Sequence, residues 1–152
     1  MKLILTVVLI GLSSLFVQQK SAKLPNKRPS NFEFEYKTDG GMINSHSKLK
    51  ISKDNCFYSQ KDKGVETNKK IDFSDEQLDK FYQLLKENKF DKITSDRKEG
   101  VYDRGGITMS VLWDKNEIVV SNAQRDFVKD KWKKNWGNIV DSVKSIIKNR
   151  SN

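Results

Sequence analysis

Aromatic and charged side chains alternate strictly along residues 32–37. Glu33 and Glu35 separate the three aromatic residues Phe32, Phe34 and Tyr36. A period of two places successive side chains on opposite faces of a strand. The three rings should therefore share one buried face, with the charges on the other. We expect this segment to be the first strand of a sheet.

Three more segments with strand character follow, and residues that favour turns separate them. The expected strands lie around Leu49 and Ile51, from Cys56 to Tyr58, and from Val65 to Ile71. The reversals between them fall at residues 39–41, 53–55 and 61–64, which are rich in Asp, Asn, Lys and Gly. The last strand has a polar centre and is the least regular. Together these segments predict an antiparallel meander.

The pattern then becomes helical. Residues 74–77 read Ser-Asp-Glu-Gln, a capping box in which the Ser74 hydroxyl and the Gln77 side chain satisfy each other's backbone amides. Apolar residues recur at helical spacing from Leu78 to Leu85, and Asn88 ends the segment. We predict a helix that starts at Ser74 and packs one apolar stripe on the sheet.

A hairpin and a second helix complete the chain. Residues 107–113 alternate again, residues 114–116 form a turn, and residues 117–121 return. A final apolar stripe, with lysines between its members, indicates a helix. We interpret the stripe as the face that packs on the core rather than as a surface for a membrane or nucleic acid. It consists of Trp132, Trp136, Ile139, Val140, Val143, Ile146 and Ile147. The order predicts an α+β fold: an antiparallel sheet of about five strands with both helices on one face.

The beginning of the chain has the pattern of an export signal. Lys2 precedes a mostly apolar run that ends at Val17, shorter than the roughly 20 residues of a membrane span. We expect residues 1–22 to be a signal peptide, with a retained anchor as the lesser alternative. Residues 23–31, rich in basic residues and proline, are expected to be a flexible linker. Residues 32–150 are then a single α+β domain.

Cysteine content and charge narrow the expected setting of this exported domain. About 130 residues after the signal peptide suffice for one core, and the single cysteine, Cys56, excludes an internal disulfide. Small exported animal proteins usually carry several disulfides, so we favour a bacterial setting. The formal charge of +9 favours anionic partners, such as acidic proteins or envelope polymers, whereas export argues against nucleic acid.

Two residues of single occurrence raise the question of catalysis. Cys56 and His46 would form a nucleophilic pair if they met in the fold. However, Cys56 starts an apolar strand, where a buried inert thiol is common, and His46 lies in a polar stretch. One His and one Cys are too few for a usual zinc site. We predict no metal and no cofactor, and we assign no catalytic residue.

The glycine-flanked loop at residues 99–106 is the best candidate binding site. If the loop has a function, we expect Arg104 to bind an anionic group of a ligand and Tyr102 to stack on that ligand. Asp103 lies between them in the sequence. The alternative is purely structural: Asp103 and Arg104 pair with each other or cap a turn. Glu99 and Asp103 would serve as an acid and base if the chain were a hydrolase.

The arrangement is similar to families of small bacterial secreted or lipoprotein domains that have no established activity. The similar residues are Leu49–Ser52, Phe57-Tyr58, the helix start Phe73–Leu78 with Phe81 and Leu85, the segment Asn88–Phe90, and Tyr102-Asp103 before the hairpin. The resemblance covers about two thirds of the chain after the signal peptide. It implies the topology and no catalytic residues. Many such proteins have a lipid-attachment cysteine, which is missing here near the signal junction.

These observations lead to one functional hypothesis and one alternative. We expect a secreted or periplasmic, non-enzymatic binding domain for a protein or an anionic envelope component, with an inhibitor or immunity protein as one form. Its binding residues would be Tyr102, Asp103 and Arg104. The alternative is a small secreted hydrolase that uses Asp103 and Glu99, or Cys56 and His46.

Overall fold

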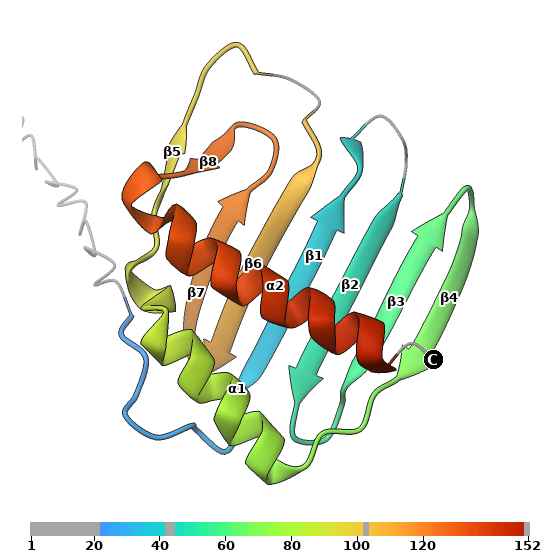
Figure 1. Cartoon of the computed structure of the whole chain (residues 1–152), viewed down its shortest axis with the longest axis vertical. Helices are drawn as coiled ribbons and strands as arrows, with labels where there is room; N and C mark the ends of the chain where they lie inside the picture. The colour runs from blue at the N-terminus through green and yellow to red at the C-terminus, as the bar shows by residue number, and fades with distance from the viewer. Residues whose placement is uncertain (1–21, 42–44, 102–103, 151–152) are drawn as a thin grey trace, which may run out of the picture.

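The computed structural model describes residues 22–41, 45–101 and 104–150, and shows an α+β fold with two sheets (Figure 1). The main sheet is antiparallel and has six strands in the order β4-β3-β2-β1-β6-β7. Its strands are β1 (Glu33–Asp39), β2 (His46–Ser52), β3 (Phe57–Asp62), β4 (Val65–Lys70), β6 (Gly106–Trp113) and β7 (Asn116–Asn122). A second sheet pairs β5 (Ser95–Arg97) with β8 (Asp126–Val128).

Two helices, α1 (Asp75–Glu87) and α2 (Lys133–Arg150), cover the same face of the main sheet in Figure 1. Short 3-10 helices, η2 (Phe90–Lys92) and η3 (Asp130–Trp132), follow α1 and precede α2. The fold class is confirmed, but the expected count of about five strands is wrong. The main sheet has six, which include the polar edge strand β4, the least regular of the expected strands. A second sheet adds β5 and β8, which are too short and polar to show an alternating pattern.

The alternation at the start of the domain has the predicted result. Phe32, Phe34 and Tyr36 are each 2% exposed or less, on the face that the helices cover. The Phe34 ring meets Phe81 of α1 edge-on at a centroid distance of 4.8 Å, and Phe32 meets Tyr82 at 5.1 Å. Because β1 lies between β2 and β6, its rings occupy the middle of the core.

The capping box at the start of α1 is also confirmed. The Gln77 amide donates to Ser74 Oγ (3.2 Å), and the Ser74 amide donates to Gln77 Oε1 (3.0 Å). At the other end, buried Asn88 donates to the Leu84 carbonyl (2.9 Å) and accepts from Asn138 of α2 (2.8 Å). The two helices are therefore joined by a hydrogen bond as well as by the core.

The segment for which the composition indicates a linker lies against α1. Leu24 is 4% exposed in the core. The Tyr82 hydroxyl donates to the Pro25 carbonyl (2.9 Å), and burial, with a smaller contribution from the charge of Asp91, raises the pKa of Tyr82 to about 12. Arg28 forms ion pairs with Asp75 and Asp79. The sequence of this segment does not predict these contacts, because Leu24 is a single apolar residue among charged residues and prolines and forms no periodic pattern.

The final helix buries most of its predicted stripe. Trp136, Ile139, Val140 and Val143 are buried, whereas Trp132 lies in η3, before the helix, and is only partly covered. Within the described ranges, no helix is both long and apolar enough to cross a membrane. The apolar run assigned to the signal peptide lies outside those ranges.

Candidate functional site

The face of the main sheet opposite the helices is polar and ordered by ion pairs. Lys50 contacts Glu33 at 2.7 Å, and Lys48 contacts Glu35 at 2.7 Å, while Lys37 also pairs with Glu35. Burial alone would raise the pKa of Glu35, but the hydrogen bonds and positive charges of Lys37 and Lys48 outweigh it and hold this pKa below its ordinary value. Glu35 therefore stays ionised and fixes two lysine side chains along the sheet.

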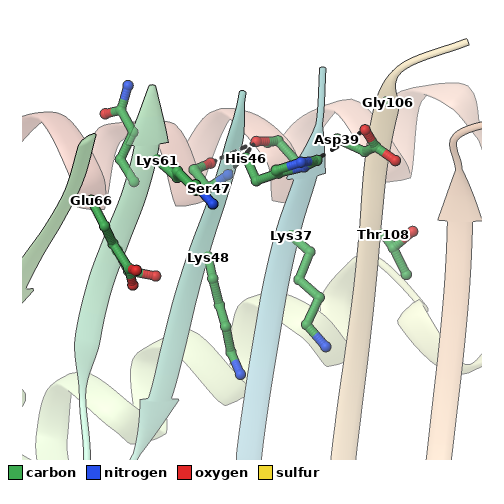
Figure 2. Close-up of a pocket in the computed structure, with 12 residues that line it drawn as sticks. Lys37, Asp39, His46, Ser47, Lys48, Lys61, Glu66, Gly106 and Thr108 are labelled. Carbon is green, nitrogen blue, oxygen red and sulfur yellow. Dashed lines mark hydrogen bonds and ion pairs between the residues drawn. The ribbon is translucent and has the colours of Figure 1, made fainter. Parts of the chain in front are cut away.

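A cavity of about 500 Å³ hollows this open face near the end of β1. Figure 2 shows Lys37, Lys48, Glu66 and Thr108 on the side of the strands away from the helices. We call this cavity the open-face pocket; it is lined by Lys37, Thr38, Asp39, His46, Ser47, Lys48, Ser59, Gln60, Lys61, Glu66, Gly106 and Thr108. The small residues of this lining include Ser59 of β3 and Gly106 and Thr108 of β6.

A second cavity, of about 510 Å³, lies where the loops at the same end of the sheet converge. We call it the arginine pocket; it is lined by Asp39, Gly41, Arg97, Val101, Arg104, Gln124 and Arg125. The three arginines come from β5, from the segment before β6 and from the loop between β7 and β8. Asp39, at the end of β1, lines both pockets.

Arg104 is held in place by groups that leave its charge intact. Its two terminal nitrogens donate to the Asp126 carbonyl (3.1 Å) and to Asn122 Oδ1 (3.3 Å). The guanidinium carbon lies 4.2 Å from the centroid of the Phe127 ring, a stacked cation-π arrangement. Both acceptors are neutral, so the side chain is oriented but not neutralised by them.

Pairing between the two short strands brings the other arginines close in the fold. Arg97 of β5 is the register partner of Asp126 in β8, and the Lys98 amide donates to the Arg125 carbonyl (2.8 Å). The Gln124 amide donates to the Arg104 carbonyl (2.9 Å), with Gln124 in the left-handed region at φ 52°. The segments that carry the three arginines are therefore joined by backbone hydrogen bonds.

Glycine allows these loops to approach one another. A Cβ on Gly105 would lie 2.4 Å from the Asp39 carbonyl oxygen and 2.9 Å from the Gly40 carbonyl carbon. A Cβ on Gly106 would lie 2.1 Å from the Asn122 carbonyl oxygen. Side chains at these positions would push β1 and the loop after β7 away from Arg104, so the glycines noted in the sequence are needed for the pocket.

Of the three residues proposed from the sequence, Arg104 is placed and lines the arginine pocket. Tyr102 and Asp103 lie outside the described residues. Glu99, the proposed partner of Asp103 in the hydrolase alternative, is exposed. Sequence reasoning missed Arg97 and Arg125, since isolated arginines in polar segments carry no signal until the fold pairs those segments.

Cys56 and His46 are not brought together. The buried Cys56 thiol donates to the Ser52 carbonyl (2.8 Å) and accepts from the Ser52 amide (3.4 Å) at the end of β2. His46 begins β2, is exposed, and has Nδ1 3.7 Å from Asp39 Oδ1. Seven strand residues at about 3.3 Å each separate the two ends by about 20 Å, too far for proton transfer between these side chains.

Among the described residues, no group of three or more His, Cys, Asp or Glu side chains is placed to hold a metal ion. The comparisons with known proteins find no family model and no curated protein that matches the chain.

Proposed function

We propose that the chain is an exported, non-enzymatic binding domain that holds its partner, a protein or an anionic envelope component, against the open face of the main sheet. The observation that carries this proposal is the one-sided packing of the sheet. Both helices cover one face, and the other face carries a cavity of about 500 Å³ and, within the described ranges, no second layer. Large polar faces of this kind, rigidly supported from behind, suit recognition of a partner surface.

The charges of the open-face pocket favour an anionic partner. Its lining has three lysines, Lys37, Lys48 and Lys61, against two carboxylates, Asp39 and Glu66. Glu35 already orients Lys37 and Lys48. Binding of a partner therefore costs less side-chain conformational entropy. Complementary charge would speed association and select acidic partners, as an inhibitor or immunity protein that covers an acidic cleft requires.

The proposal that the protein is exported depends on the beginning of the chain. Lys2 followed by a short apolar run has the order of a secretory signal. The matching cell compartment would be the periplasm or the extracellular space. Detection of a processed chain in the exported fraction, by intact mass, would test this step, and retention of residues 1–22 on a cytoplasmic protein would contradict it.

The binding role is tested by capture from envelope extracts with a matched pair of variants. Lys37→Ala combined with Lys61→Ala removes two charges from the open-face pocket and leaves Lys48 paired with Glu35. The control, Lys53→Ala with Lys115→Ala, removes the same charge from exposed turns at the other end of the sheet.

We expect the pocket variant to lose the partner that the unmodified chain retains through salt washes, and the control to keep it. Equal retention by both variants, or equal loss from both, would contradict binding at the open face.

A further inference from the structure

The two edges of the main sheet are covered to different degrees. At one edge, β7 lies against β8 of the second sheet. At the other edge, β4 pairs with β3 and has no further strand beside it within the described ranges (Figure 1). All residues of β4 except Lys69 are exposed, and Val65 is 67% exposed. An open strand edge of this kind can pair with the strand of another chain.

The backbone of β4 directs alternate residues toward β3 and away from it. The Ile71 amide donates to the Cys56 carbonyl (2.9 Å), one position beyond the ladder of β3 and β4. Hydrogen-bonded and non-hydrogen-bonded pairs alternate along an antiparallel ladder. The residues whose backbone groups face β3 are therefore Val65, Thr67 and Lys69. Those whose N–H and C=O groups point outward along the open edge are Glu66, Asn68 and Lys70.

The side chains of these outward residues lie on one face of the sheet. Glu66 lines the open-face pocket, and Figure 2 shows it on the side of the strands away from the helices. Because side chains alternate with a period of two, Asn68 and Lys70 lie on the same side. One acidic and one basic side chain therefore occupy the two ends of the open edge, on the open face.

Charge and backbone direction together select one register for pairing between two copies of β4. An antiparallel pair centred on Asn68 places Glu66 of each copy opposite Lys70 of the other, and outward backbone groups meet outward groups at all three positions. A pair centred on Glu66, Lys69 or Lys70 places that residue opposite itself, and like charges directly opposite each other destabilise a sheet. A pair centred on Thr67 leaves Lys70 beyond the strand of the second copy.

We propose that β4 pairs antiparallel with β4 of a second copy of this chain, centred on Asn68, and joins the two main sheets into one. Three hydrogen-bonded residue pairs, with two backbone bonds each, and two Glu66–Lys70 ion pairs hold the copies together. The existing contact between Lys70 and Asp72 (3.5 Å) joins two exposed side chains, so its loss costs little.

The geometry of this pairing has two consequences. A strand of six residues gives a small contact compared with the roughly 1,200 to 2,000 Å² of stable complexes, so the dimer should dissociate on dilution. The two-fold axis is perpendicular to the sheet, which keeps both open faces on the same side. The pairing does not depend on the function proposed for the open face, because the backbone groups that form it lie at the edge.

The first test measures the mass of the purified protein by sedimentation equilibrium from micromolar to millimolar concentration. We expect a monomer that converts to a dimer as the concentration rises. A protein that remains monomeric at millimolar concentration overturns the proposal.

Charge reversal tests which residues meet. Glu66→Lys and Lys70→Glu each replace two attractive contacts with two repulsive ones and should weaken dimerisation about tenfold or more. An equimolar mixture of the two variants should dimerise again, because each position 66 then faces an opposite charge at position 70. The control Lys115→Glu makes the same charge change in the exposed turn between β6 and β7 and should leave the dimer unchanged. Circular dichroism and thermal unfolding establish that each variant is folded.

Disulfide cross-linking tests the register. In the proposed pair, the two Asn68 Cα atoms lie about 5.5 Å apart, within the range that a disulfide spans. The two Thr67 residues are diagonal neighbours about 7 to 8 Å apart. Mild oxidation should therefore link Asn68→Cys into covalent dimers much faster than Thr67→Cys.

Three results would overturn the proposal even if the protein dimerises. They are unchanged dimerisation of both charge-reversal variants, an equimolar mixture that stays monomeric, and equal cross-linking at positions 67 and 68. Lys70 does not line the open-face pocket. Capture of a partner by a monomeric Lys70→Glu variant would therefore uphold the open-face function, whereas loss of capture by a chain that still dimerises would count against that function alone.

Discussion

Arg28 Nε lies 2.6 Å from Asp79 Oδ1, which joins the segment before the sheet to helix α1. The arginine side chain is only 10% exposed, although its partners Asp75 and Asp79 are largely in solvent. We predict that Arg28→Ala lowers the free energy of unfolding by about 1 kcal/mol and increases trypsin cleavage after Lys27. The control is Lys80→Ala, which removes an exposed pair with Glu76. Equal effects of the two variants would show that Arg28 has no special role.

The lowered pKa of Glu35 predicts a pH dependence of stability. A carboxylate whose pKa is lower in the folded state stabilises the fold above its unfolded-state pKa, and this contribution is lost as the pH falls through the folded-state value. Glu35→Gln should therefore reduce the free energy of unfolding at pH 7 by about 0.5 to 1 kcal/mol. At pH values well below the ordinary glutamate pKa, the difference in unfolding free energy between the variant and the unmodified chain should shrink.

Urea unfolding at a series of pH values measures this effect. Glu117→Gln is the control, because Glu117 is an exposed carboxylate on the next strand but one. A pH-independent difference for Glu35→Gln, or the same pH profile for Glu117→Gln, would contradict the ion-pair explanation.

Two glycine substitutions should have opposite effects. Gly105→Ala would place a Cβ 2.4 Å from the Asp39 carbonyl oxygen, so we predict a loss of about 1 to 3 kcal/mol in unfolding free energy. Gly137→Ala in α2 meets no atom within 4 Å and should stabilise the protein by about 0.5 to 1 kcal/mol through helix propensity. Thermal unfolding of both variants provides the comparison. Stability of Gly105→Ala equal to that of the unmodified chain would refute the close approach.

The Cys56 thiol should be unreactive in the folded protein. It is 6% exposed and exchanges hydrogen bonds with the Ser52 backbone. Reaction with an aromatic disulfide reagent should therefore be slow in buffer and rapid and stoichiometric in concentrated urea. Complete labelling of native protein within the mixing time would contradict the buried position and reopen a chemical role for this residue.

Sequence patterns predicted those parts of the fold in which one residue type repeats with a fixed period. Alternation over Phe32, Phe34 and Tyr36 identified the first strand and its buried face, and Ser74 with Gln77 identified the start of α1. The edge strand β4 was expected despite its polar centre, because a Lys63-Gly64 reversal precedes it; both residues have positive φ.

The candidate site was predictable only in part. The glycines near Arg104 indicated a loop with unusual geometry, and two described residues of this loop, Val101 and Arg104, line a cavity. Arg97 and Arg125 could not be identified in advance, because they meet through the pairing of β5 with β8, two strands of three residues each. Strands this short bury too few side chains to leave a pattern. Convergence of charges across such a pairing is a property of tertiary structure.

The one-sided packing of the sheet separates stability from recognition at the level of single residues. In β1, Phe34 and Tyr36 maintain the core, whereas their neighbours Glu35 and Lys37 lie on the open face. Substitutions at every second position of the inner strands can therefore alter the surface offered to a partner and leave the hydrophobic interior intact. A chain built in this way can acquire a new binding specificity by a few surface changes, with its folding determinants retained on the opposite side.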